Sequence, residues 1–346
     1  MKRRKTRGVK VGKLKIGGNA PITVQSMCTT HTRDIDATVR QIHELEEAGC
    51  EIIRVSVTDM NEAKSLKKIK ENISIPLVAD IHFDYRLALE SAKYADKLRI
   101  NPGNIGSNDK VKLVVEQAKD YHIPIRIGVN LGSLEKEIIE KFGLTSKAMV
   151  NSALKHIKIL EELDFYNTII SMKASDIKRT VDAYRMMASK VDYPFHIGIT
   201  EAGTAYSGTI KSSIGIGSLL LDGIGDTIRV SLTSNPLEEV KAGFEILNSL
   251  GLRKQRTIIS CPSCGRTEID LIGLTKSVEK ATAHIRKPIK IAVMGCAVNG
   301  PGEAREADVG VAGAKNFGII FRKGNVVKKV KKDKILKALL DEINKL

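Results

Sequence analysis

The chain has 346 residues, of which 42% are hydrophobic and 28% charged, and its formal net charge is +16. This composition is that of a globular protein and excludes the collagen, low-complexity and wholly disordered classes. The length fits one barrel-sized domain of about 250 residues with a smaller domain beside it.

The positive charge is concentrated at the two ends of the chain. Residues 1–20 carry eight Lys or Arg and no acid, and residues 321–346 carry nine basic against three acidic residues. This distribution favours solvated ends over a nucleic-acid groove. Aromatic residues make up only 4% of the chain and Trp is absent, so stacking platforms for single strands are scarce. We therefore expect no nucleic-acid partner.

Residues 1–20 include VKVGKLKIGG, whose alternating apolar residues around a glycine predict a short hairpin. We expect this basic amino-terminal hairpin to plug one end of the domain that follows. No apolar run of signal-peptide length comes after it, and no stretch reaches the ~20 apolar residues of a membrane span. The sequence thus predicts a cytoplasmic protein with no membrane partner.

Residues 21–250 repeat one unit: a short apolar run, polar residues at its carboxyl end, and an amphipathic helical stretch. This pattern predicts strand–helix units that share a parallel sheet. The eight runs begin at Thr23, Ile52, Pro76, Lys97, Ile125, Asn167, Phe195 and Thr227. No Gly-x-Gly-x-x-Gly follows the first strand, as a doubly wound dinucleotide-binding sheet would require. We therefore predict an α/β fold, a (β/α)8 TIM barrel that binds the substrate.

Polar side chains stand at the carboxyl ends of nearly all these strands, where barrel enzymes have their active sites. They are Arg54, Asp80, His82, Arg99, Asn101, Arg126, Asn130, Lys173, Thr200, Glu201, Arg229 and Ser231. The two acids are too few to neutralise the four arginines and the lysine. Because Arg and Lys suit phosphate oxygens, we expect a diphosphate or bisphosphorylated small molecule as the substrate.

Two of these groups are candidates for acid–base work. His82 stands beside Asp80 at one strand end, where it could donate a proton or orient an oxygen. Glu201 follows Thr200 and is the only acid at the end of the seventh strand. We expect Glu201 to be the barrel residue that transfers a proton.

A linker at residues 251–257 leads to a second α/β domain, residues 258–346, which contains three of the five cysteines. IISCPSCGR predicts a strand that ends in the Cys-x-x-Cys turn of Cys261 and Cys264, and IKIAVMG predicts a strand that leads to Cys296. Redox pairs and zinc sites share the Cys-x-x-Cys spacing, but a second zinc-type pair is missing from the sequence. Three thiolates near glycine-rich loops predict a 4Fe-4S cluster with a replaceable fourth ligand.

Glu303, in the AVNGPGE loop after Cys296, is our candidate for the fourth, oxygen ligand. Three other residues compete with Glu303 as candidates for the fourth ligand. Cys28 follows the first strand, where it could be a functional thiol at the barrel mouth. Cys50 precedes the second strand and is expected to be an inert buried thiol, and His284 is expected to cap a helix.

The polar-ended barrel strands, SCPSCGR and MGCAVNGPGE resemble the IspG-type 4-hydroxy-3-methylbut-2-enyl diphosphate synthases in their two-domain bacterial form. The resemblance covers essentially the whole chain. It implies an iron-sulfur oxidoreductase acting on CH or CH2 groups in the non-mevalonate isoprenoid pathway. Its reaction is the reductive ring opening and dehydroxylation of 2-C-methyl-D-erythritol 2,4-cyclodiphosphate, with electrons delivered one at a time by flavodoxin or ferredoxin.

The resemblance also implies roles for individual residues. The cluster ligands correspond to Cys261, Cys264, Cys296 and Glu303, of which Glu303 also has a catalytic role. The diphosphate contacts correspond to Arg54, Arg99, Asn101, Arg126, Asn130, Lys173 and Ser231. The polar groups near the reacting carbons correspond to Asp80, His82, Thr200 and Glu201.

The chain connectivity predicts a head-to-tail homodimer. The helix over 236–250 runs back to the base of the barrel, and residues 251–257 span only ~24 Å when extended. A partner's barrel mouth is therefore easier to reach than the subunit's own, and the resemblance implies the same assembly. Two other functions stay open: a pterin- or corrinoid-linked barrel enzyme, which predicts acids and amides at the mouth, and a zinc-stabilised RNA-binding protein.

Overall fold

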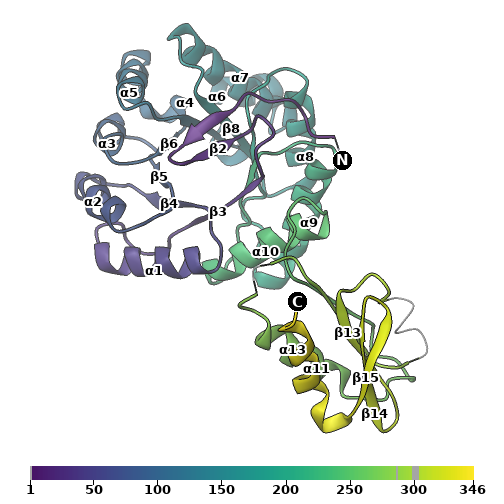
Figure 1. Cartoon of the computed structure of the whole chain (residues 1–346). Helices are drawn as coiled ribbons and strands as arrows, with labels where there is room; N and C mark the ends of the chain where they lie inside the picture. The colour runs from purple at the N-terminus through teal and green to yellow at the C-terminus, as the bar shows by residue number, and fades with distance from the viewer. Residues whose placement is uncertain (1, 286, 298–303) are drawn as a thin grey trace. The chain divides into compact units, whose positions relative to one another are not determined.

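The computed structural model describes residues 2–285, 287–297 and 304–346. The chain divides into two compact units, Met1–Arg253 and Lys254–Leu346 (Figure 1). No helix in the described part of the chain is long and apolar enough to cross a membrane.

The larger unit is a barrel of eight parallel strands in the order β8-β7-β6-β5-β4-β3-β10-β9. A parallel bridge between Ile170 and Phe195 joins the two edges and closes the ring. The strands are β3 (Thr23–Met27), β4 (Ile52–Ser56), β5 (Leu77–Asp80), β6 (Lys97–Ile100), β7 (Ile125–Asn130), β8 (Thr168–Lys173), β9 (His196–Ile197) and β10 (Thr227–Ile228). The predicted barrel, with a small α/β domain after it, is confirmed.

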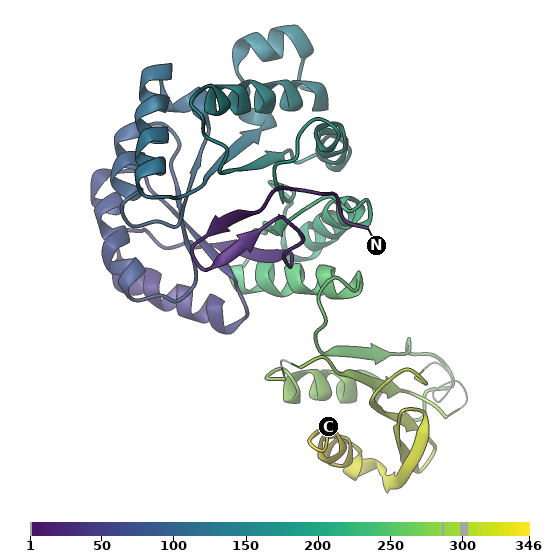
Figure 2. The same cartoon turned by 45° about the horizontal axis from the view of Figure 1, so that its top comes forward.

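Helices surround the strands on the outside of the barrel (Figure 2). They are α1 (Ile35–Glu47), α2 (Met60–Glu71), α3 (Tyr85–Ser91), α4 (Pro102–Ile105), α5 (Asn108–Asp120), α6 (Lys136–Phe142), α7 (Ser146–Glu162), α8 (Ile177–Ala188), α9 (Ala205–Leu221) and α10 (Pro236–Ser249), with a 3-10 turn η1 (Leu131–Ser133). The side chains of Asp34, Asp59 and Asp176 each accept a bond from a backbone N–H of the first turn. These caps begin helices directly after the loops at the barrel mouth.

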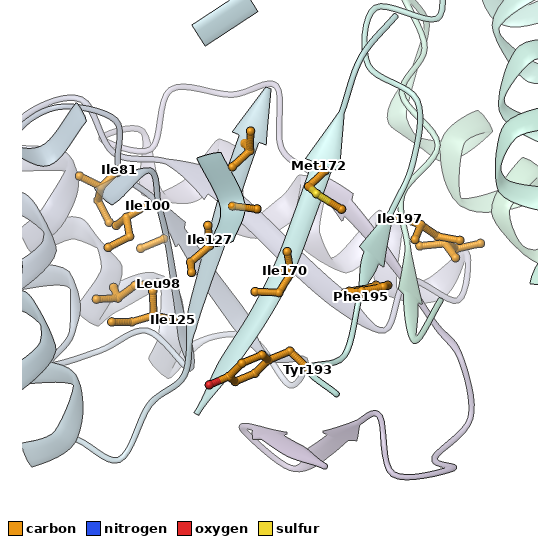
Figure 3. Close-up of a cluster of buried hydrophobic side chains, with 14 of the residues drawn as sticks. Ile81, Leu98, Ile100, Ile125, Ile127, Ile170, Met172, Tyr193, Phe195 and Ile197 are labelled. Carbon is orange, nitrogen blue, oxygen red and sulfur yellow. The ribbon is translucent and has the colours of Figure 1, made fainter. Parts of the chain in front are cut away.

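The apolar core lies between the strands and the helices, as the isoleucines of β6, β7 and β8 show (Figure 3). On β6, Leu98 and Ile100 belong to this core. Because successive strand side chains point to opposite faces, Lys97 and Arg99 face the barrel interior. The same alternation directs the polar strand residues of the sequence towards one interior space.

The amino-terminal hairpin, β1 (Val9–Val11) and β2 (Leu14–Ile16), closes the base of the barrel. Its Val9, Val11 and Ile16 pack against Ile52, Val78 and Ile169 at the amino ends of barrel strands. The hairpin therefore plugs the barrel, as the sequence predicts.

The arginines before the hairpin are only partly exposed and have partners on the barrel, which differs from the solvated end that the sequence predicts. Arg3 forms an ion pair of 3.0 Å with the buried Asp226. The guanidinium of Arg4 lies 4.0 Å from the ring centroid of Phe195 and donates to the carbonyl of Val191. These arginines anchor the amino terminus to the barrel base, because a planar guanidinium can stack on a ring while it donates to carbonyls.

The smaller unit is a five-stranded sheet in the order β11-β12-β13-β14-β15, whose first three strands are parallel. Its elements are β11 (Thr257–Ser260), α11 (Leu271–Ala281), β12 (Lys290–Met294), β13 (Val309–Gly313), β14 (Phe317–Arg322), β15 (Asn325–Lys331), a 3-10 turn η2 (Lys332–Lys334) and α13 (Ile335–Ile343). Helices α11 and α13 lie on one face of the sheet (Figure 1). Val278 of α11 and Leu339 of α13 pack there against Val293 and Val311.

Candidate functional site

A pocket of about 160 Å³ opens at the carboxyl ends of the barrel strands. It is lined by Arg54, Asp80, His82, Arg99, Arg126, Asn130, Ser171, Lys173, Thr200, Arg229 and Ser231. Nine of the site residues that the sequence predicts therefore lie in one pocket. They come from strands far apart in the chain, because barrel closure brings all the strand ends together.

Asp80 is the only carboxylate among the described residues that line this pocket. It accepts from Nη1 of Arg99 at 3.0 Å, and its other oxygen lies 3.4 Å from Nε2 of His82 and 3.7 Å from Nε of Arg54. Burial alone would raise the pKa of Asp80. The positive charge of Arg54, the hydrogen bond from His82 and the charge of Arg99 outweigh burial and hold this pKa well below its usual value.

Arg126 is a buried cation in this pocket, with only 1% of its surface exposed. Its Nε and Nη1 atoms have no hydrogen-bond partner among the described residues. Burial and the neighbouring charges of Arg54 and Arg99 lower the pKa of Arg126. A buried guanidinium with unused donors is costly, so this arrangement is suited to an anion that enters the pocket.

Lys173 adds a second cation without an acid partner among the described residues. Burial first, and then the charge of Arg126, lower the pKa of the Lys173 amine. Burial also lowers the pKa of Arg54 to about 10. Each cation lowers the pKa of the cations beside it. An anion bound between them would raise those pKa values again.

One pocket residue, Ser171, is missing from the polar strand ends that the sequence predicts at the mouth, and Arg229 is among them without an assigned role. Ser171 lies two positions before Lys173 on β8, and the two share the inner face of the strand. The sequence signal that could have identified Ser171 is a serine in an otherwise apolar run, two positions from Lys173 and therefore on the same side of the strand. Arg229 is recognisable in the sequence only as a polar strand end, and its Nη2 lies 3.4 Å from the buried carboxylate of Glu239.

Two predicted site residues lie outside the pocket lining. The side chain of Asn101 turns back to accept from the backbone N–H of Gly103, so it caps α4. Glu201 is exposed, and its φ of 51° lies in the left-handed region that non-glycine residues rarely adopt. Backbone strain of this kind is common at functional sites, where the surrounding structure maintains it.

Cys28 is not a thiol of the barrel mouth. Its neighbour Met27 faces the interior, where Sδ lies 2.8 Å from Nη2 of Arg54. Cys28 therefore points to the helix side of the strand, belongs to the apolar core and is 7% exposed. Burial raises the pKa of Cys28, and that of Cys50, to about 12, so both thiols stay protonated. The expectation that Cys50 is buried is confirmed.

Cys261, Cys264 and Cys296 follow the carboxyl ends of β11 and β12, which are adjacent parallel strands. None of them forms a disulfide. The N–H of Gly295 donates to Sγ of Cys261 at 3.2 Å, and hydrogen bonding from the Arg266 backbone lowers the pKa of Cys264. The lowered pKa of Cys264 favours its thiolate, which is the form that binds metals. The three cysteines therefore lie at one end of the sheet.

The described residues do not complete a metal site. No three or more His, Cys, Asp or Glu side chains among them are gathered closely enough to hold a metal ion. Glu303, the predicted fourth ligand, lies outside the described residues. His284 comes after α11, where the chain returns to the start of β12. That end of the sheet is opposite the cysteines, so His284 is not placed beside them.

Residues 6–244 match the family model of the GcpE TIM-barrel domain, and residues 257–345 match that of the GcpE protein C-terminal domain. The chain belongs to the GcpE family. It is 60% identical over 347 residues to a protein of Caldanaerobacter subterraneus named 4-hydroxy-3-methylbut-2-en-1-yl diphosphate synthase (flavodoxin), across 99% of this chain and 98% of that protein. A protein of Clostridium perfringens with the same name is 56% identical over 343 residues, across 98% of both. The family resemblance of the sequence is confirmed.

Solved structures share the barrel of this GcpE chain without sharing its sequence. A type I 3-dehydroquinate dehydratase from Clostridium difficile superimposes with a TM-score of 0.54 at 15% identity, across 71% of this chain and 98% of that one. A dihydropteroate synthase from Stenotrophomonas maltophilia gives 0.53 at 10% identity, across 71% of this chain and 97% of that one. At these identities the similarity shows the fold alone.

Proposed function

We propose that this GcpE chain is a 4-hydroxy-3-methylbut-2-enyl diphosphate synthase, which opens the ring of 2-C-methyl-D-erythritol 2,4-cyclodiphosphate reductively and removes a hydroxyl group. The observation that carries the proposal is the barrel pocket, where a buried Arg126 and Lys173 lack acid partners among the described residues. A doubly anionic diphosphate would supply the missing charge. The names of the relatives support the same reaction.

In this proposal the pocket binds the diphosphate before any chemistry takes place. Arg54, Arg99, Arg126 and Lys173 contact its oxygens, and the side chains of Asn130, Ser231 and Thr200 donate hydrogen bonds to it. The free Nε and Nη1 donors of Arg126 support this role. Asp80 orients Arg99 through the 3.0 Å ion pair, so the guanidinium of Arg99 is already positioned when the substrate binds.

His82 and Glu201 are proposed to act on the substrate, His82 by orienting an oxygen and Glu201 by transferring a proton. The side chain of His82 is 46% exposed, and its Nε2 lies 3.0 Å from Nη1 of Arg99. This position suits a group that orients a substrate oxygen. Glu201 is proposed to donate the proton. It lies in the loop after β9, and its backbone is strained. Asn101 is proposed to act through the α4 turn that it caps.

Cys261, Cys264 and Cys296 are proposed to hold a 4Fe-4S cluster, with Glu303 as the exchangeable fourth ligand. The absence of disulfides and the N–H donor to Cys261 support a thiolate site. A cluster bound there supplies two electrons, one at a time, from flavodoxin or ferredoxin. The rest of the chain excludes water and holds the substrate.

The proposed assembly is a head-to-tail homodimer, in which one subunit's cysteine domain serves the other's barrel. Arg253 donates to the carbonyl of Ile22 at 2.9 Å and pairs with Glu51, so the chain leaves the barrel at the amino ends of its strands. The pocket lies at the opposite ends. Because the segment before Cys261 is short, a second subunit is the simpler source of the cysteines.

Purification without oxygen tests the cofactor and the reaction together. We expect a brown protein with about four irons per chain, which converts the cyclodiphosphate when reduced flavodoxin is supplied. A colourless protein with about one zinc per chain would refute the proposal. The pterin-linked and RNA-binding alternatives are not favoured, because the pocket is rich in cations and Arg3 and Arg4 are occupied at the barrel base.

Mixed subunits test the dimer. Arg126→Ala disables the barrel site and Cys264→Ser disables the cysteine domain, so each variant alone should be inactive. After co-refolding of equal amounts, a head-to-tail dimer regains about a quarter of the wild-type activity, since half of the dimers are mixed and each has one intact site. No recovery, or a monomer in sedimentation with full activity, would contradict the assembly.

A further inference from the structure

Three exposed lysines of the smaller unit lie at the same end of the sheet as the cysteines, towards the opposite edge. Lys315 is in the turn that connects β13 to β14, and Lys329 and Lys331 are on β15. The turn after β13 is at the same end of the sheet as Cys296, because β12 and β13 are parallel. We call Lys315, Lys329 and Lys331 the lysine edge.

The strand register places the lysine edge level with the cysteines. Met294 pairs with Ala312, which pairs with Ile319, which pairs with Lys329. Lys331 pairs with Phe317 and is therefore level with the position two residues beyond Met294. That position is Cys296. Three strand spacings of about 4.8 Å separate β12 from β15, so Lys331 lies roughly 14 Å from the line of β12.

The lysine edge has no internal partner to neutralise it. None of its three ammonium groups forms an ion pair within the described part of the chain. Their neighbour Lys328 differs, because it points to the helix side and pairs with Glu342 at 3.2 Å. Lys329 lies on the opposite face, where its Nζ is 5.4 Å from the ring centroid of Phe317. Lys329 and Lys331 thus lie on the side of the sheet away from α11 and α13, next to the part of that face on which Ala304 and Ala307 pack.

Among the described residues, acids occur at this end of the sheet on the helix side. Glu268, Asp270 and Asp333 line a groove between α11 and η2, where Lys332 donates to the carbonyl of Glu268 at 2.6 Å. The helix side therefore carries acids together with lysines, since Lys276 and Lys280 of α11 are also exposed there. A negatively charged partner is attracted to the exposed, unpaired lysines of the lysine edge, away from the acidic groove.

We propose that the lysine edge is the docking surface for an acidic one-electron carrier protein. This inference rests on the proposed function. Each encounter transfers one electron from the reduced carrier to the cysteine centre, so the carrier is oxidised and two encounters supply the two electrons of one turnover. Electron transfer requires close approach, and the lysine edge is level with Cys296. Exposed charges at a rim mainly steer association, which suits a carrier that binds briefly and leaves.

Binding is measured by isothermal titration of the anaerobically prepared protein with oxidised flavodoxin. The Lys329→Glu/Lys331→Glu variant should bind at least tenfold more weakly than wild type at low salt. Addition of Lys315→Glu should weaken binding further. The difference should shrink at high salt, because screening removes the attraction.

The matched control is Lys276→Glu/Lys280→Glu, which makes the same charge change at exposed positions of α11, on the other face of the sheet. It should bind flavodoxin within about twofold of wild type, as expected for local steering. An equal loss in both double variants, or no loss in the lysine-edge variant, would overturn the docking surface.

Turnover separates this inference from the proposed function. With dithionite-reduced methyl viologen as the donor, the lysine-edge variant should keep the wild-type rate, whereas its kcat/KM for reduced flavodoxin should fall at least tenfold. A parallel loss with both donors would contradict docking. If wild type binds flavodoxin through the lysine edge but converts no cyclodiphosphate with either donor, the proposed function fails and the docking surface stands.

Discussion

Replacement of Gly128 by alanine tests how the pocket positions its arginines. Gly128 lies on β7, and a Cβ atom built there would be 2.4 Å from Nε of Arg99, 2.8 Å from its Nη2 and 2.9 Å from its Cζ. Real Cβ atoms do not approach other atoms so closely, so the Arg99 guanidinium must move. It would leave the 3.0 Å ion pair with Asp80 and the position from which it is proposed to contact the diphosphate.

The size of the effect follows from the contacts that are lost. A hydrogen bond to a charged group contributes about 1.5–3 kcal/mol, and 1.4 kcal/mol is a factor of ten. The Gly128→Ala variant should therefore bind the cyclodiphosphate about 10- to 100-fold more weakly. Its free energy of unfolding should fall by only about 1–3 kcal/mol, the usual cost of an extra methyl group in a packed interior.

Isothermal titration with the cyclodiphosphate measures the affinity, and thermal melting followed by circular dichroism checks the fold. The control is Gly132→Ala at η1, where a Cβ would meet nothing within 4 Å. That variant should retain wild-type affinity. If Gly128→Ala also binds within twofold of wild type while remaining folded, the reasoning that places Arg99 in the binding site is refuted.

Three more predictions concern buried charges and thiols. Arg126→Met should raise the free energy of unfolding in urea by about 1–4 kcal/mol and abolish diphosphate binding, because it removes a buried cation without an acid partner in the described chain; a less stable variant would contradict this. Asp80→Asn should destabilise by about 3–5 kcal/mol at pH 7. The pKa of Asp80 is lowered by folding, so its contribution is complete above the unfolded pKa of about 3.9 and is lost as the pH falls further; urea titrations should show the two proteins converge in acid, and a constant gap would refute the assignment. Iodoacetamide at about pH 8 should label the three cysteines of the smaller unit in cluster-free protein, whereas Cys28 and Cys50, with pKa values of about 12, should react only after denaturation, as mass spectrometry can check.

The sequence alone predicts the barrel and the pocket to the extent that local patterns encode them. Each strand is a short apolar run, and its polar end marks the mouth of any parallel barrel. This is why Arg54, Arg126 and Lys173 can be assigned to one pocket from their positions in the sequence. The cysteine spacing likewise predicts that Cys261, Cys264 and Cys296 lie at one end of the sheet, because the ends of neighbouring parallel strands are adjacent in space.

Only the tertiary structure decides which side of a strand each residue occupies. A shift of one position separates the interior from the helix side, which is why Met27 faces Arg54 whereas Cys28 is buried in the core. Residues just beyond a strand follow the loop instead of the strand alternation, so Asn101 caps a helix and Glu201 lies outside the pocket. The sequence determines which residues approach the barrel mouth, but the closure of the ring and the loop conformations determine which of them face it.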